Sequence, residues 1–254
     1  MMPLDRLIFF PDAFVPEPPP GVEERWITTA DGVRLHAWYA PAPDVSATHP
    51  AGAPTLVWSH GNGGNIAGRA DVLLQLRAAG LSVLAYDYRG YGRSAGRPSE
   101  RGVYLDAEAA YDSERARGTP AERIVCFGES LGGAVAIHLA TQRRSAGVAV
   151  VSTFTRLTDV ARRRYGPLGL LAGTRFDSLA RIQTLAVPVL IAHGDQDEVV
   201  PFELGERLFA AAHAPKRFIR AAGTGHNDVF SSPGLIEALA AFAGEVTAHR
   251  QTKL

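Results

Sequence analysis

The sequence around Ser130 constrains the fold more than any other stretch of the chain. The apolar run 124–127 has the length and composition of a buried strand, and the stretch 130–142 is typical of a helix. Between them lies the motif G-E-S-L-G at 128–132, whose glycines permit a turn too sharp for a Cβ atom. The spacing predicts a strand–turn–helix unit that presents a serine nucleophile. An ordinary tight turn is the alternative interpretation.

The remaining pattern predicts an α/β fold with helices on both faces of a mostly parallel sheet, of the eight-stranded type. Continuous apolar runs alternate with helical stretches, which is typical of parallel strands buried on both faces. Further strands are expected at 56–58, 81–86, 148–151, 189–192 and 217–220, and further helices at 99–117, 202–212 and 235–248. Two earlier runs, 25–29 and 33–40, flank Ala30-Asp31-Gly32 and predict an antiparallel N-terminal hairpin.

The composition of three segments predicts the domain organisation. Residues 1–24 are expected to form an N-terminal arm and a connector, which is proline-rich over 16–21. Residues 25–254 are expected to form one domain. Within it, 152–187 is a short cap-like insertion, too short for a large lid.

A serine hydroxyl needs a base that takes its proton, and His226 is the candidate. Of the eight histidines, only His226 lies in a loop directly after the last expected strand, in the sequence G-T-G-H-N-D at 223–228. Sites of parallel sheets lie at the carboxyl ends of the strands, which favours this position. A plain surface histidine is the alternative. His60 and His193 each end a strand before a glycine and are interpreted as loop-shaping residues.

The base needs an acid that holds its tautomer, and Asp197 is the candidate. It lies in H-G-D-Q-D-E-V-V-P at 193–201, after an expected strand, and is far enough along the loop to reach the histidine. Asp195 is the rival, since it follows the strand closely and is suited to capping the turn.

The developing oxyanion requires two backbone donors. The N–H of Leu131, directly after the serine, is expected to be one. The other is expected in S-H-G-N-G-G-N at 59–65, whose glycines allow close approach; Asn62 is favoured, with Gly63 as the alternative. This loop lacks the spacings of nucleotide-binding loops. No metal site is expected, because the histidines are scattered and there is neither an H-E-x-x-H motif nor a cysteine cluster.

Five motifs together resemble a known family: 59–65, Y-D-Y-R-G-Y-G-R-S at 86–94, 128–133, 193–201 and G-H at 225–226. They are similar to the lid-poor α/β hydrolases, which include bacterial esterase-like proteins and the eukaryotic protein depalmitoylases. The resemblance runs from about residue 26 to the C-terminus. It implies the α/β-hydrolase fold and a triad of Ser130, Asp197 and His226. Residues 1–24 contain no cysteine, unlike the cysteine-rich N-terminal segment of the depalmitoylases.

The expected activity is that of a serine hydrolase without a cofactor, cleaving esters or thioesters through an acyl-enzyme on Ser130. A peptidase or an acyltransferase with the same triad is the first alternative, and a non-catalytic binding protein is the second. The substrate is expected to be a small or lipid-like acyl compound. Candidates for its pocket are Phe154, Leu170, Phe176 and Val199. The apolar residues of the insertion form either an acyl-binding wall or a packing layer between helix and sheet.

Composition excludes several other classes of protein. The 26 basic and 26 acidic residues of the 254-residue chain give zero net charge, so nucleic-acid binding is not expected. The single cysteine, Cys126, allows no internal disulfide and is interpreted as a small apolar strand residue. No apolar run approaches the roughly 18 residues that span a bilayer. A cytoplasmic monomer is therefore the expectation.

Overall fold

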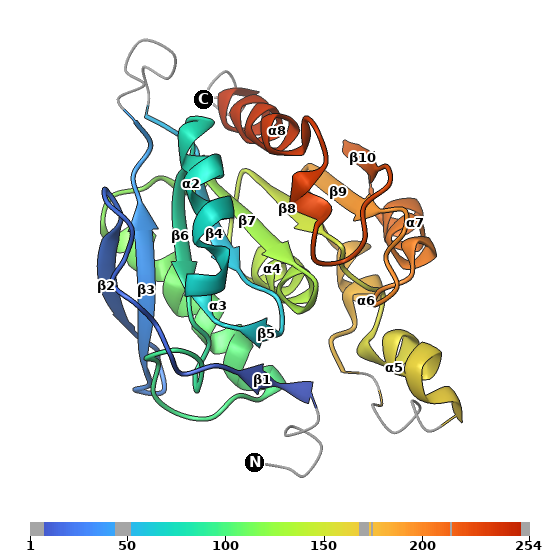
Figure 1. The fold of residues 1–254 in the computed structure, drawn as a ribbon. Coiled ribbons are helices and arrows are strands. Elements are labelled where there is room, and N and C mark those ends of the chain that lie inside the picture. The colour runs from blue at the N-terminus through green and yellow to red at the C-terminus, as the bar shows by residue number, and fades with distance from the viewer. Residues whose placement is uncertain (1–7, 44–51, 168–172, 174, 214, 250–254) are drawn as a thin grey trace.

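An eight-stranded sheet forms the centre of the molecule (Figure 1). The computed structural model describes residues 8–43, 52–167, 173, 175–213 and 215–249. The strand order is β10-β9-β8-β7-β4-β6-β3-β2; β3 is antiparallel to both neighbours, and every other adjacent pair is parallel. The strands are β2 (Glu23–Thr28), β3 (Arg34–Ala40), β4 (Thr55–Ser59), β6 (Ser82–Tyr86), β7 (Ile124–Glu129), β8 (Gly147–Val151), β9 (Val189–Gly194) and β10 (Lys216–Ala221). The expected α/β architecture with its N-terminal hairpin is confirmed.

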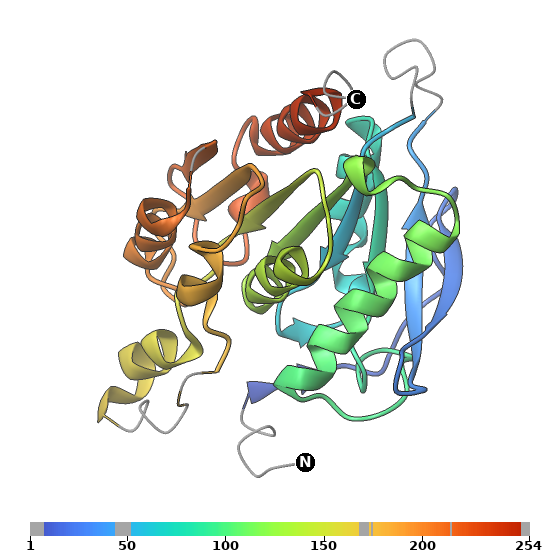
Figure 2. The same cartoon turned by 180° about the vertical axis from the view of Figure 1, so that it is seen from behind.

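Helices cover both faces of this sheet (Figures 1 and 2). Helices α2 and α8 lie on one face, and α3, α4, α6 and α7 lie on the other, with α5 beyond the ends of the strands. Their bounds are α2 (Ala70–Ala78), α3 (Glu100–Ala116), α4 (Leu131–Gln142), α5 (Leu157–Tyr165), α6 (Ser178–Ile182), α7 (Phe202–Ala211) and α8 (Leu235–His249). Short 3-10 helices cover Ile66–Arg69, Ala121–Arg123 and Val229–Ser231.

The two helical layers explain why the central strands are buried on both faces and are mostly apolar. Successive side chains of a strand point to opposite faces of the sheet. In β7, Ile124 and Cys126 therefore belong to the core beneath α3 and α4, whereas Val125 and Phe127 belong to the core beneath α2 and α8. Burial raises the pKa of the Cys126 thiol to about 12, as expected for a residue that packs as an apolar side chain.

A second, two-stranded sheet was not predicted from the sequence. Strand β1 (Phe10–Pro11) pairs in parallel with β5 (Gly63–Gly64), so the N-terminal arm lies against the loop that follows β4. Ile8 and Phe9 are buried, which anchors the arm on the domain. Two-residue strands made of glycine, proline and one aromatic residue carry no periodic pattern, so they cannot be predicted from the sequence.

Candidate active site

Ser130 lies in a sharp turn between β7 and α4. Its backbone has φ 51° and ψ −118°, a conformation that residues with a side chain rarely adopt. Two contacts hold it there: its N–H donates to the carbonyl of Val151 at 2.9 Å, and the Thr153 hydroxyl donates to its own carbonyl at 2.7 Å. The turn therefore depends on β8 as well as on its own sequence.

Gly128 has a steric reason to be glycine. A Cβ atom at this position would lie 2.1 Å from the carbonyl oxygen of Gly132, far inside contact distance. The end of β7 thus approaches the first turn of α4 so closely that no side chain fits between them. This close approach lets the chain reverse within one residue and leaves the Ser130 side chain at the carboxyl end of the sheet.

The structure brings Ser130, His226 and Asp197 into one hydrogen-bonded chain. Nε2 of His226 lies 3.0 Å from Oγ of Ser130, and its Nδ1 lies 2.7 Å from Oδ2 of Asp197. The three residues follow β7, β10 and β9 respectively, so they meet only because these strands end at the same edge of the sheet. The distances match those of a nucleophile, a base and an orienting acid.

Asp197 is held as an ionised acceptor. Its side chain is buried, and its Oδ1 accepts the N–H groups of Val199 and Val200 at 2.9 and 2.7 Å. Burial alone would raise the pKa of this carboxyl group, but hydrogen bonds to His193 and His226 outweigh it and hold the pKa well below its usual range. The charge is available to hold the histidine in one tautomer and to stabilise its protonated form.

The rival carboxylate, Asp195, has other partners. It accepts the N–H of Gly223 at 2.7 Å and the Nε–H of Arg220 at 2.9 Å. These bonds join the loop after β9 to β10 and to the loop that follows it. Asp195 thus holds the loop of His226 through Gly223, and these two contacts are not with its own turn.

In the loop between β4 and the 3-10 helix Ile66–Arg69, the backbone N–H groups of Gly61 and Asn62 differ in their partners. The N–H of Gly61 donates to Oε1 of Glu129 at 2.9 Å, and Nε of Arg69 donates to the same oxygen at 2.9 Å. The N–H of Asn62 has no hydrogen-bond acceptor among the described residues. Leu131 opens α4, where an N–H has no partner within the helix. These are the two amides that the sequence predicts as oxyanion donors, and their role stays a prediction.

His60 shapes this loop as a neutral side chain. Its ring is buried 4.4 Å from the ring of Tyr88, and its Nδ1 lies 2.6 Å from the carbonyl oxygen of Gly61. Burial, reinforced by the positive charge of Arg69, lowers the pKa of His60 to about 3. The nearest carboxylate, Asp87, lies 3.6 Å from its Nε2. His60 is therefore uncharged at neutral pH.

The four residues expected to line an acyl pocket lie in different environments. Phe154 and Phe176 are 3% and 0% exposed, and the ring of Phe176 packs edge-on against Phe9 and Tyr104. Val199 is 50% exposed in the loop that carries Asp197. Leu170 lies outside the described residues. Phe176 is thus a packing contact, whereas Val199 presents apolar surface next to Asp197.

This chain is similar to several known proteins in sequence and in structure. The family described as serine aminopeptidase, S33, matches residues 51–176. An uncharacterized protein of Mycobacterium tuberculosis is 43% identical, over 88% of this chain and 80% of its own. The alpha/beta hydrolase domain-containing protein 17B of Xenopus laevis is 32% identical, over 77% of this chain and 68% of its own. This chain belongs to the α/β-hydrolase superfamily. An esterase of Pyrococcus furiosus shares the fold with a TM-score of 0.74, at 19% identity over 94% of this chain and 97% of its own.

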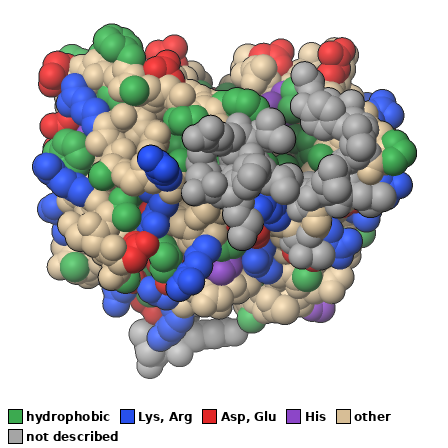
Figure 3. Space-filling model, turned by 90° about the horizontal axis from the view of Figure 1, so that it is seen from below, with side chains coloured by type: hydrophobic (Ala, Val, Ile, Leu, Met, Phe, Trp, Pro, Cys, Tyr) green, Lys and Arg blue, Asp and Glu red, His purple; other side chains and the backbone are tan. Residues whose placement is uncertain are grey.

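Figure 3 views this α/β hydrolase from the end where its parallel strands terminate. Basic side chains are prominent on the described part of this face. Such a surface favours the approach of negatively charged groups. Within the described residues, no helix is long and apolar enough to cross a membrane, and no three His, Cys, Asp or Glu side chains are grouped so as to hold a metal ion.

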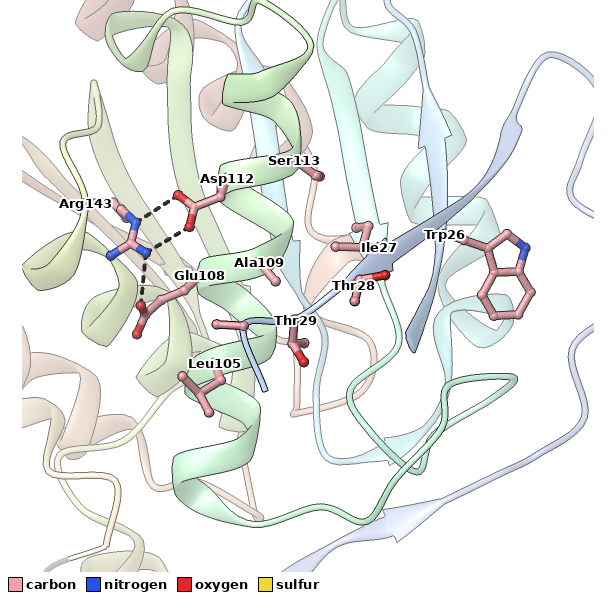
Figure 4. A pocket seen from close by; sticks show the side chains of 11 residues that line it. Trp26, Ile27, Thr28, Thr29, Leu105, Glu108, Ala109, Asp112, Ser113 and Arg143 are labelled. Carbon is pink, nitrogen blue, oxygen red and sulfur yellow. Dashed lines mark hydrogen bonds and ion pairs between the residues drawn. The ribbon is translucent and has the colours of Figure 1, made fainter. Parts of the chain in front are cut away.

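A separate hollow of about 440 Å³ lies between β2 and α3 (Figure 4). Arg143 crosses one side of it and pairs with Asp112 and Glu108 at 2.8 and 3.1 Å. None of its lining residues belongs to the loops that carry the hydrogen-bonded chain. The hollow is therefore not a substrate pocket for that serine.

Sequence reasoning misses two residues of this region, Glu129 and Tyr91. Glu129 occupies a variable position of the motif G-x-S-x-G, although a charged residue inside this turn is a signal in itself. Tyr91 lies in the motif at 86–94. Its hydroxyl donates to Oδ1 of Asn62 at 2.9 Å. A tyrosine between two glycines, in a loop after a buried strand, gives no indication of that contact.

Proposed function

We propose that this chain is a serine hydrolase that cleaves carboxylic esters or thioesters through an acyl-enzyme on Ser130. The observation that carries the proposal is the chain of contacts from Oγ of Ser130 through His226 to Asp197, with 3.0 and 2.7 Å between its atoms. The N–H groups of Asn62 and Leu131 have no acceptor among the described residues and can supply the donors that such chemistry needs.

In the first half-reaction, Oγ of Ser130 attacks the carbonyl carbon while its proton passes to Nε2 of His226. The carbonyl oxygen becomes an oxyanion and accepts hydrogen bonds from the N–H groups of Asn62 and Leu131. His226 then gives the proton to the leaving alcohol or thiol as the bond from carbon to oxygen or sulfur breaks. The acyl group remains on Ser130, and Asp197 stabilises the transient imidazolium.

In the second half-reaction, water takes the place of the leaving group. His226 removes one proton from the water, whose oxygen attacks the acyl carbon. The bond from that carbon to Oγ of Ser130 then breaks as the histidine returns the proton to Oγ. The products are a free carboxylic acid and the regenerated enzyme, so no cofactor takes part.

The acyl group is expected to lie beside the loop after β9. Val199 is half exposed there, two residues after Asp197, and apolar surface next to a triad suits a hydrocarbon chain. Leu170 remains a candidate from the sequence. The basic side chains on this face suit the approach of a substrate that carries a negatively charged group, although they give no preference between esters and thioesters.

A fluorophosphonate probe tests the proposal, since it reacts only with an activated serine. Purified wild-type protein is expected to become labelled, and Ser130→Ala is expected to remain unlabelled. Hydrolysis of short-chain p-nitrophenyl esters and acyl thioesters should follow the same pattern. A folded wild-type protein that neither labels nor hydrolyses these compounds would contradict the proposal and favour a non-catalytic binding protein.

Peptidase activity is the second candidate, because the matching family is described as serine aminopeptidase. An amine leaving group needs stronger protonation by His226 than an alcohol does. Comparison of matched ester and amino-acyl anilide substrates decides between them. A kcat/KM for the anilide at or above that of the ester would favour the peptidase.

A further inference from the structure

The hydroxyl of Tyr91 lies where the N-terminal arm meets the candidate oxyanion loop. It donates to Oδ1 of Asn62 at 2.9 Å and accepts the N–H of Phe10 at 3.2 Å. The tyrosine is fully buried, with its ring 5.4 Å from the ring of His60. One oxygen atom therefore connects two segments that lie more than fifty residues apart in the sequence.

The arm also contacts the loop directly. Nδ2 of Asn62 donates to the carbonyl of Ile8, so both ends of this amide side chain are engaged. The N–H of Asp12 donates to the carbonyl of Gly64 at 3.1 Å, and Nδ2 of Asn65 donates to the carbonyl of Asp12 at 3.0 Å. Hydrogen bonds thus join residues 8–12 of the arm to residues 62–65 of the loop.

Two residues outside the arm, Glu129 and Arg69, also hold the loop. Oε1 of Glu129 accepts the N–H of Gly61, and the guanidinium of Arg69 donates to the carbonyl of Gly63 at 2.6 Å. The polar groups around Asn62 are therefore engaged from both sides, whereas its own N–H is left without an acceptor among the described residues. These contacts fix the backbone around Asn62 and leave its N–H free to donate to an oxyanion.

We infer that Tyr91 is a positioning residue and that the N-terminal arm completes the oxyanion hole through it. Glycines occupy three of the five positions in 61–65, and glycine loses the most conformational freedom when it is ordered. A loop of this composition needs external contacts to stay in one conformation. Donors fixed before the reaction stabilise an oxyanion without reorganisation, so a loosened loop lowers the rate of acylation. The inference rests on the proposed serine-hydrolase function.

The arm is itself anchored at a distance from the loop. The ring of Phe9 packs edge-on against Phe176, with 6.3 Å between the ring centroids, and both side chains are buried. Phe176 belongs to the segment after α5. The contact fixes the arm to the segment after α5. The arm is therefore anchored next to Ile8, whose carbonyl accepts from the side chain of Asn62.

Tyr91→Phe tests the inference, because it keeps the ring and removes only the hydroxyl. Its kcat for a p-nitrophenyl ester is expected to fall on the order of tenfold, with KM nearly unchanged, since the lost contact matters in the transition state. Affinity for an alkyl trifluoromethyl ketone, whose adduct with Ser130 carries an oxyanion, should fall by a similar factor. Tyr111→Phe is the matched control, because this buried tyrosine donates instead to the carbonyl of Arg144.

Hydrogen–deuterium exchange of a peptide covering 61–65 gives a readout that does not depend on activity. Exchange is expected to be faster in Tyr91→Phe than in wild type and unchanged in Tyr111→Phe. Unchanged exchange in Tyr91→Phe overturns the inference, and so does a loss of activity that lies in KM alone. If wild type neither labels with fluorophosphonate nor hydrolyses esters, the proposed function has failed. The exchange data then decide separately whether Tyr91 holds the loop.

Discussion

Gly132 lies against the carbonyl of Ser59 so closely that a Cβ atom on it would be 1.9 Å from that oxygen. The contact joins the first turn of α4 to the end of β4, immediately before the candidate oxyanion loop. Backbone atoms, not flexible side chains, fill the space. Any side chain at this position must therefore displace one of the two segments that form the site.

Gly132→Ala is expected to destabilise the protein by about 1–3 kcal/mol and to reduce ester hydrolysis about 100-fold or more, because the serine turn must shift. Chemical unfolding and steady-state kinetics measure the two effects. Gly68→Ala is the control, since nothing lies within 4 Å of the added atom there. Wild-type kinetics in Gly132→Ala would show that the turn tolerates the shift.

Asp197→Asn is expected to lower kcat about 10⁴-fold with a small effect on KM, because the amide no longer holds the histidine tautomer or stabilises the imidazolium. Asp195→Asn is the matched control in the same loop. It accepts from Gly223 and Arg220, so its kcat should stay within a few-fold of wild type. A larger loss in Asp195→Asn than in Asp197→Asn would reverse the assignment of the acid.

Phe176→Ala is expected to destabilise the protein by about 3–5 kcal/mol and to leave the preferred acyl chain length unchanged, since the ring is a fully buried packing contact. Urea unfolding and kinetics on p-nitrophenyl esters of increasing length check both parts. Phe242→Ala, in α8 on the opposite face of the sheet, is the control for general destabilisation. A shift in chain-length preference seen only in Phe176→Ala would place this ring in the acyl pocket.

Stability is expected to depend on pH through His60. Its pKa is lowered to about 3 in the folded protein, chiefly by burial, so between that value and the ordinary histidine value of about 6.5 the unfolded chain binds more protons. The stabilising contribution of neutral His60 is therefore present above pH 6.5 and is lost as the pH falls toward 3. Asp106 acts in the opposite direction, because burial raises its pKa to about 6.

Urea unfolding at pH 7.5 and pH 5.0, for wild type and His60→Gln, measures this contribution. The variant should lose less stability on acidification than wild type, because glutamine does not titrate. His213→Gln, at an exposed position, is the control and should keep the wild-type dependence. Equal losses in wild type and His60→Gln would mean that other groups set the pH dependence.

The local elements were predictable where the pattern repeats over many residues. The strands and helices around Ser130 follow from apolar runs and from glycine spacing, and the structure differs from them by one or two residues at their ends. The insertion 152–187 is expected from the sequence only as a short cap-like segment, and its described residues contain α5 and α6. Helices of nine and five residues are too short for the long amphipathic pattern that makes a helix visible in a sequence.

The sequence by itself determined the strand–turn–helix unit, the hairpin and the identity of the candidate serine, acid and base, because each depends on residue type and local spacing. Only the tertiary structure decided that Tyr91 contacts Asn62, that Glu129 accepts the N–H of Gly61 and that the arm pairs with β5. These contacts join segments far apart in the chain. Their distances depend on how strands are ordered in the sheet, and no local pattern of residues encodes that order.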